Sequence, residues 1–83
     1  MKRIRVMIVE DSPVISALLA YCVGRDPRLE VCAAPGSAEE ALDTFEEIAP
    51  DVIAMDIRLP GIDGLEATRR IMSTKPVPIV VVA

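Results

Sequence analysis

The chain has 83 residues, of which 52% are hydrophobic, and its formal net charge is −4. A chain of this size builds one domain at most, with a core near the lower limit for independent stability. The negative charge argues against a nucleic-acid or anionic-membrane role. Because no apolar run approaches membrane-spanning length, we expect a soluble, cytoplasmic protein.

The first predicted elements are a strand and a helix. Residues 4–9 are apolar and rich in β-branched side chains, which is typical of a strand buried on both faces. Ser12 is a good N-cap and Pro13 suits the first helical turn, so we expect a helix that Gly24 stops. The apolar residues of this helix recur at helical spacing: Val14, Ile15, Leu18, Leu19, Cys22 and Val23.

A second strand and helix follow. The short apolar segment 29–34 predicts a strand, and Ser37 with Glu40 forms a capping-box pattern at the start of a helix that ends before Pro50. The apolar stripe of that helix is expected to be Ala38, Ala41, Leu42, Phe45 and Ile48.

The last part of the chain continues the same alternation. Residues 52–56 predict a third strand, and the segment to Gly64 contains too many helix and strand breakers for regular structure. Helical spacing returns over 65–73, and residues 78–83 predict a final strand. The order β-α-β-α-β-α-β predicts an α/β fold with a parallel sheet and right-handed crossovers.

Two cysteines and no histidine leave little scope for a zinc site. Cys22 is predicted on the apolar face of a helix and Cys32 within a strand. We therefore expect both to be buried core thiols in a reducing compartment, not partners in a disulfide.

Acidic residues follow two of the predicted strands directly. Glu10 and Asp11 end the first strand, and Asp56 ends the third. If these strands are parallel neighbours, their carboxyl ends meet at one edge of the sheet, where open α/β folds bind ligands. The sequence therefore predicts a cluster of three carboxylates at that edge.

Such a cluster suits Mg²⁺ and phosphoryl chemistry. Asp11 and Asp56 are candidate direct ligands, Glu10 can reach the ion through a water, and Arg58 can turn its backbone carbonyl inward. With Mg²⁺ present, an aspartate such as Asp56 can accept a phosphoryl group as an acyl phosphate. Without metal the three charges repel, so we expect at least one carboxyl pKa to be raised.

Three segments make a resemblance specific. They are Val-Glu-Asp-Ser at 9–12, Met-Asp-Ile-Arg-Leu-Pro-Gly-Ile-Asp-Gly at 55–64, and Pro-Ile-Val-Val-Val at 78–82. In this order they resemble the receiver domain of two-component response regulators. Residues 65–72 look most similar to the receiver half of chemotaxis protein-glutamate methylesterases.

The resemblance implies a function and a site. It implies that Asp56 accepts a phosphoryl group from a histidine kinase, that Glu10 and Asp11 hold Mg²⁺, and that Arg58 contributes its main-chain oxygen. It also implies the flavodoxin-like, doubly wound receiver fold, here lacking its last α-β-α, with strand order 2-1-3-4. Residues 1–83 would then be a partial receiver domain without enzymatic activity of its own, and any methylesterase domain would lie further along a longer polypeptide.

Two departures from the family pattern concern the switch that follows phosphorylation. Ala83 stands where the family has Ser or Thr at the end of the fourth strand, and the family's lysine after the fifth strand has no counterpart. Lys75 is no substitute, because it precedes the fourth strand and is expected at the opposite edge of the sheet.

The partial domain has consequences for association. Strand 78–83 is expected to be an apolar edge strand, a template for pairing with another chain, and the sheet face beside helix 14–23 is expected to expose an apolar patch. We therefore expect either self-association through these surfaces or a fragment of a longer polypeptide.

Other functions remain open from the residues alone. The three acids could be solvated strand ends, or the chain could be a pseudo-receiver that has lost phosphorylation and acts as an interaction and dimerisation module, which Ala83 favours. A phosphatase with an aspartyl nucleophile is disfavoured, because Arg58 occupies the position of its general acid. A calcium loop is disfavoured because residues 56–63 lack alternating oxygen ligands.

Overall fold

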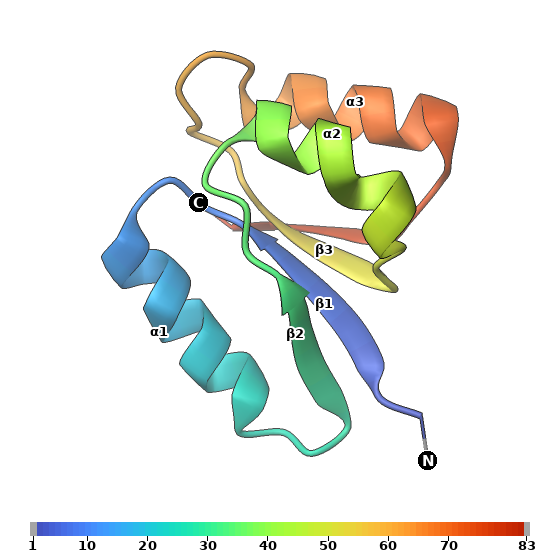
Figure 1. Ribbon diagram of the computed structural model, residues 1–83. Coiled ribbons are helices and arrows are strands. Elements are labelled where there is room, and N and C mark those ends of the chain that lie inside the picture. The colour runs from blue at the N-terminus through green and yellow to red at the C-terminus, as the bar shows by residue number, and fades with distance from the viewer. Residues whose placement is uncertain (1, 83) are drawn as a thin grey trace.

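The computed structural model describes residues 2–82 (Figure 1). Strands and helices alternate along this part of the chain, as the sequence predicts. The elements are β1 (Ile4–Val9), α1 (Pro13–Gly24), β2 (Leu29–Ala33), α2 (Ala38–Ile48), β3 (Val52–Asp56), α3 (Gly64–Thr74) and β4 (Ile79–Val82).

The four strands form one parallel sheet in the order β2-β1-β3-β4. Helix α1 lies on one face of this sheet, and α2 and α3 lie together on the other (Figure 1). The predicted α/β class, parallel pairing and strand order 2-1-3-4 are therefore confirmed. None of the helices in residues 2–82 has the length and apolar character needed to cross a membrane.

The hydrophobic core lies between the sheet and the helix pair α2 and α3. Alternate residues of the two central strands point into it, because successive side chains of a strand face opposite sides. Helix α2 contributes three of its five predicted stripe residues as buried groups, and Leu42 and Ile48 pack beside them. The fully enclosed members from strands and helices are Met7, Val9, Ile53, Met55, Ala38, Ala41, Ala67 and Ile71.

Each helix begins at a short polar side chain that accepts a hydrogen bond from a first-turn amide. The acceptors are Ser12 for α1, Ser37 for α2 and Asp63 for α3, at 3.3, 3.1 and 2.9 Å. These caps satisfy amides that have no partner within the helix. The predicted starts at Ser12 and Ser37 are confirmed, and Asp63 adds a third cap.

Helix α1 differs from the prediction in what it buries. None of its residues is fully buried, and Val14 and Leu18 are 76% and 56% exposed. Cys22 is exposed, so its predicted core location was wrong, whereas Cys32 is half-buried and packs against the core. The physical reason is that α1 is apolar on all sides while it contacts mainly β1 and β2, so most of its surface has no partner in residues 2–82.

Two smaller differences concern helix ends and faces. Gly24 is the last residue of α1 and has no positive φ, so the helix does not end in a left-handed glycine. In α3 the buried side is formed by Ala67 and Ile71, whereas Leu65 and Met72 are exposed. Exposed apolar side chains therefore occur on α3 as well as on α1.

Strand β4 is the edge of the sheet among the described residues, because it pairs with β3 alone. Val80 and Val81 in this strand are 58% and 48% exposed. This agrees with the expectation of an apolar edge strand. The prediction for Ala83 falls outside the described residues.

Candidate functional site

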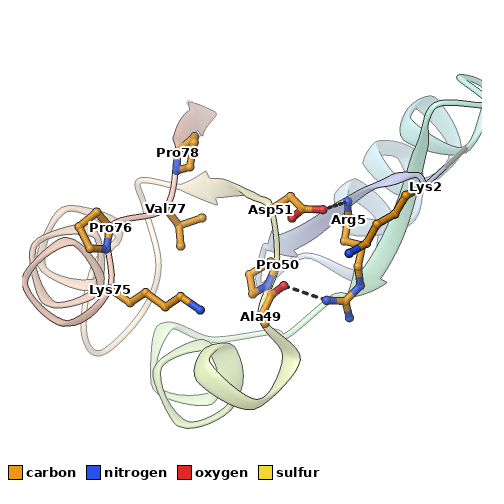
Figure 2. Close-up of a pocket in the computed structure, with 9 residues that line it drawn as sticks. All are labelled: Lys2, Arg5, Ala49, Pro50, Asp51, Lys75, Pro76, Val77 and Pro78. Atoms are coloured by element: carbon orange, nitrogen blue, oxygen red, sulfur yellow. Dashed lines mark hydrogen bonds between the residues drawn. The ribbon is translucent and has the colours of Figure 1, made fainter.

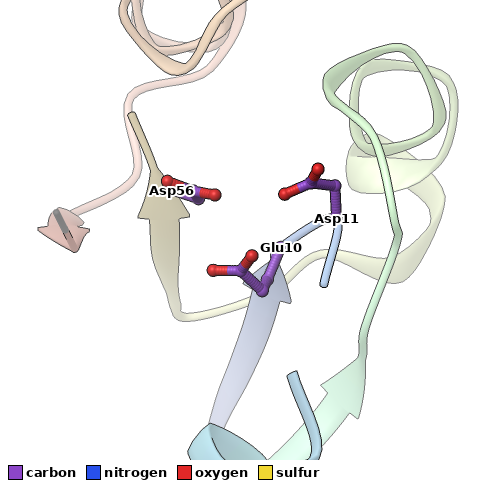
Figure 3. A group of neighbouring side chains, drawn as sticks. All are labelled: Glu10, Asp11 and Asp56. Carbon is purple, nitrogen blue, oxygen red and sulfur yellow. The ribbon is translucent and has the colours of Figure 1, made fainter. Parts of the chain in front are cut away.

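The register of β1 with β3 brings the predicted acids together. Val9 lies opposite Met55, so Glu10 and Asp56 follow at neighbouring strand ends. Figure 3 shows the carboxylates of Glu10, Asp11 and Asp56 turned toward one shared space. One carboxylate oxygen from each lies within 4.8 Å of the others.

Backbone hydrogen bonds fix these carboxylates in place. Glu10 Oε2 accepts a hydrogen bond from the Ser12 amide at 3.1 Å, and the Glu10 amide donates to the carbonyl of Pro35 at 3.3 Å. Asp56 Oδ1 accepts from the Arg58 amide at 3.0 Å. The turns that follow the two strands are therefore tied to the acids themselves.

The three acids differ in their contact with solvent. Glu10 is only 8% exposed, Asp56 is half-buried and Asp11 is exposed. Burial is the largest cause that raises the pKa of Glu10. The charge and hydrogen bonding of Asp56 raise this pKa further, while the hydrogen bond from the Ser12 amide partly opposes the shift. The prediction that at least one carboxyl pKa is raised is confirmed.

The loop between β3 and α3 is anchored at several points. The side chain of Leu59 is buried in the core, and Gly61 has a φ of 73°, in the left-handed region that favours glycine. The side chain of Arg58 is exposed, as expected, and its amide is bound to Asp56. The inward role of the Arg58 carbonyl stays a prediction.

Gly64 is a site residue whose main role the sequence did not reveal. A Cβ atom at this position would lie 2.8 Å from Cα of Ile57 and closer still to the carbonyl oxygen of Asp56. The start of α3 is thus packed directly against the backbone that carries Asp56. The sequence marks Gly64 as a helix start, but only the structure shows that a side chain cannot fit there.

Three basic residues, Lys2, Arg5 and Lys75, lie at the other end of the sheet. Lys2 and Lys75 line a hollow of about 430 Å³ beside Pro50 and Asp51, formed by segments that precede the strands (Figure 2). The predicted location of Lys75 away from the acids is confirmed. In the same region Arg5 donates to the carbonyls of Ile48 and Ala49 and so completes the end of α2.

The donor set of the acidic cluster fits a hard cation. Mg²⁺ prefers oxygen ligands and needs only one or two carboxylates, because it retains several waters. Carboxylates from two strands provide such donors, and a cation offsets the repulsion that raises the pKa of Glu10. The acidic triad is therefore able to bind Mg²⁺, and it is consistent with a phosphoacceptor site.

Fold and site together define a class of signalling domain. The sequence model of the response regulator receiver domain matches residues 6–83, so the chain belongs to that family. The chain is similar to a protein of Paramagnetospirillum magneticum named protein-glutamate methylesterase/protein-glutamine glutaminase 2, with 57% identity over 82 residues. A protein of Nitrosospira multiformis with the same name, without the number, is 49% identical over 80 residues.

These relatives are much longer than the chain. The matched region is 99% of this chain but 23% of the Paramagnetospirillum protein, and 96% of this chain but 22% of the Nitrosospira protein. The chain thus corresponds to their receiver part alone.

Solved structures show the same fold. The response regulator domain of Thermotoga maritima CheB superposes with a TM-score of 0.92 at 32% identity, over 96% of this chain and 60% of that chain. A LuxR-family response regulator from Aurantimonas gives a TM-score of 0.90 at 33% identity, over 96% of this chain and 58% of that chain.

Replacement of Gly64 by alanine tests the close packing behind Asp56. Because the new Cβ would collide with the backbone of Asp56 and Ile57, we expect Gly64→Ala to lower the free energy of unfolding by about 1–3 kcal/mol. Urea unfolding measures the loss. Gly36→Ala is the matched control, since no atom lies within 4 Å of its Cβ position; equal losses in both variants would contradict this explanation.

Replacement of Glu10 by glutamine tests the electrostatic cost of the cluster. Because the pKa of Glu10 is raised above 4.5, the folded chain binds this proton more tightly than the unfolded chain does. The free energy of unfolding should therefore fall as the pH rises from 4.5 to the raised pKa of Glu10.

Glu10→Gln keeps an oxygen acceptor for the Ser12 amide and removes this pH dependence. We expect the variant to be more stable than the wild type at neutral pH without Mg²⁺, with a gain that shrinks on acidification and on addition of Mg²⁺. Urea unfolding at a series of pH values measures it, and Glu47→Gln on the exposed side of α2 controls for net charge. A gain that is independent of pH would refute the burial argument.

Proposed function

We propose that this chain is a phosphoacceptor receiver module, in which Asp56 takes a phosphoryl group from a histidine kinase. The observation that carries the proposal is the convergence of Glu10, Asp11 and Asp56 at one sheet edge in a chain of the receiver family. Kinases of this class phosphorylate receiver domains, so the family supplies the partner. Residues elsewhere in the chain offer no comparable group of acids among those described.

Each acid has a distinct role in this proposal. Asp56 Oδ forms a bond to phosphorus as the phosphorus–nitrogen bond of a phosphohistidine breaks, and the leaving imidazole keeps the electron pair of that bond. Asp11 and Asp56 would ligate Mg²⁺ directly, Glu10 would support it through a water, and Arg58 would add its backbone carbonyl. When bound, Mg²⁺ neutralises charge on the phosphoryl oxygens and on the acids.

The named relatives support a proposal about the cellular context. We propose that residues 1–83 are the N-terminal part of a receiver domain in a cytoplasmic, chemotaxis methylesterase-type response regulator. The chain itself is then not an enzyme, and any methylesterase activity belongs to a further domain.

A second candidate is a pseudo-receiver that keeps the fold as an interaction module without being phosphorylated. Ala83 favours it, because alanine lacks the hydroxyl that the family places at this position. The intact acidic cluster favours the phosphoacceptor function, because metal binding and phosphorylation of Asp56 do not require that hydroxyl.

Incubation with Mg²⁺ and acetyl phosphate separates the two candidates. We expect intact mass spectrometry to detect one phosphoryl adduct on the wild-type chain, which disappears in Asp56→Ala and without Mg²⁺. Asp63→Asn is the matched control, because it removes a nearby carboxylate but keeps an oxygen that can cap α3. No adduct on the wild type would favour the pseudo-receiver, and an adduct that persists in Asp56→Ala would refute the assignment of Asp56.

We also propose that this 83-residue chain self-associates through the open edge of β4. Within residues 2–82 the strand has unpaired backbone groups on one side, and its exposed valines, Val80 and Val81, add apolar surface. A second copy of β4 can pair with these backbone groups and cover the apolar surface, because the edges of two sheets can pair across a twofold axis.

Sedimentation at several concentrations tests this association. We expect a dimer whose population rises with concentration, and about tenfold or greater weakening in Val80→Lys, since two lysines would meet at the pairing edge. Val14→Lys, at a still more exposed valine on α1, is the control and should leave the dimer unchanged. A wild-type chain that stays monomeric at all concentrations would contradict the proposal.

A further inference from the structure

Glu39 reaches from α2 to the loop that follows Asp56. Its Oε2 accepts a hydrogen bond from the amide of Ile62 at 3.2 Å, although the two residues are 23 positions apart. A Cβ atom on Gly61 would lie 2.6 Å from the same oxygen. The carboxylate therefore packs against a stretch of backbone that is bare only because residue 61 is glycine.

This contact adds a hydrogen bond to the middle of the loop, which is also held by the packing of Leu59 in the core. The start of the loop is held by the Arg58 amide on Asp56, and its end is held by the Gly64 amide on the Ile57 carbonyl at 3.3 Å. Between them, the hydrogen bonds found within residues 2–82 for positions 59–62 reduce to the one from Ile62 to Glu39. The loop that begins with Arg58 is thus tied to α2 at Ile62.

We propose that Glu39 is a positioning residue for the candidate metal site, which fixes the loop so that the Arg58 carbonyl is available to a divalent cation. The inference rests on the proposed function, because it assigns Glu39 to the same site. Glu39 does not belong to the acidic triad itself. It acts through the backbone of the loop.

The location of Glu39 suits this role. It lies in the first turn of α2, where the helix dipole favours a carboxylate. A hydrogen bond to a charged acceptor is stronger than one between neutral groups. Because the loop is already ordered, it loses less conformational entropy when a cation binds.

The neighbouring residue provides a matched control. Glu40 carries the same charge in the same helical turn, but its side chain makes no hydrogen bond among the described residues. Glu40→Ala therefore removes an equal charge from the vicinity without touching the loop. Glu39→Gln removes the charge but keeps a carbonyl oxygen that can accept from Ile62.

The experiment is a Mg²⁺ titration of the 83-residue chain and its variants, followed by the backbone amide resonances of Arg58 and Ile62. The Mg²⁺ dependence of acetyl phosphate labelling is measured in parallel. We expect Glu39→Ala to shift the Ile62 amide before any Mg²⁺ is added and to raise the half-saturating Mg²⁺ concentration about threefold or more. Glu39→Gln should recover most of this loss, and Glu40→Ala should match the wild type.

The other outcomes overturn the inference. An unchanged Ile62 amide in Glu39→Ala would show that the hydrogen bond does not hold the loop. If Glu39→Ala and Glu40→Ala weaken Mg²⁺ binding equally, or if Glu39→Gln does not restore it, Glu39 would act on Mg²⁺ binding through its charge alone. A wild type that binds Mg²⁺ but is never phosphorylated would refute the proposed phosphoacceptor function alone, whereas a wild type without any Mg²⁺ response would refute both.

Discussion

The parallel pairing of β1 with β3 is the constraint on which the site depends. It sets Val9 opposite Met55, so that Glu10 and Asp56, far apart in the sequence, become neighbours at one edge of the sheet. A slip of one residue would exchange the faces of a whole strand, moving core side chains such as Met55 into solvent. The energy that buries the core therefore also fixes the spacing of the carboxylates.

The same arrangement has an electrostatic cost that a cation can relieve. Glu10 is buried next to the charge of Asp56, and its raised pKa reflects that unfavourable environment. A simple structural role would be better served by an uncharged side chain, because an ionised group needs compensation when it leaves water. The cluster thus lowers the stability of the fold when no cation is present, and it attracts positive charge. Such a conflict is common where function and stability compete.

The sequence predicted those features that follow from strand order and local pattern. Alternating strands and helices, the caps at Ser12 and Ser37, and the meeting of the acids all depend on rules that act along short segments or across neighbouring parallel strands. The prediction failed for Cys22 in α1, because an all-round apolar helix does not reveal which side meets the sheet. The close packing of Gly64 on Asp56 could not be predicted either, since it depends on how the whole loop closes.

Two glycines in and after the β3–α3 loop, Gly61 and Gly64, allow other groups to approach the backbone closely near the site. Gly64 lets α3 start directly against the carbonyl of Asp56, and Gly61 leaves room for the carboxylate of Glu39. The first contact joins α3 to the end of β3, and the second joins α2 to the middle of the loop. Leu59 adds an apolar anchor between them. A loop held in this way loses little further freedom when a ligand binds, which is the condition for a pre-organised site.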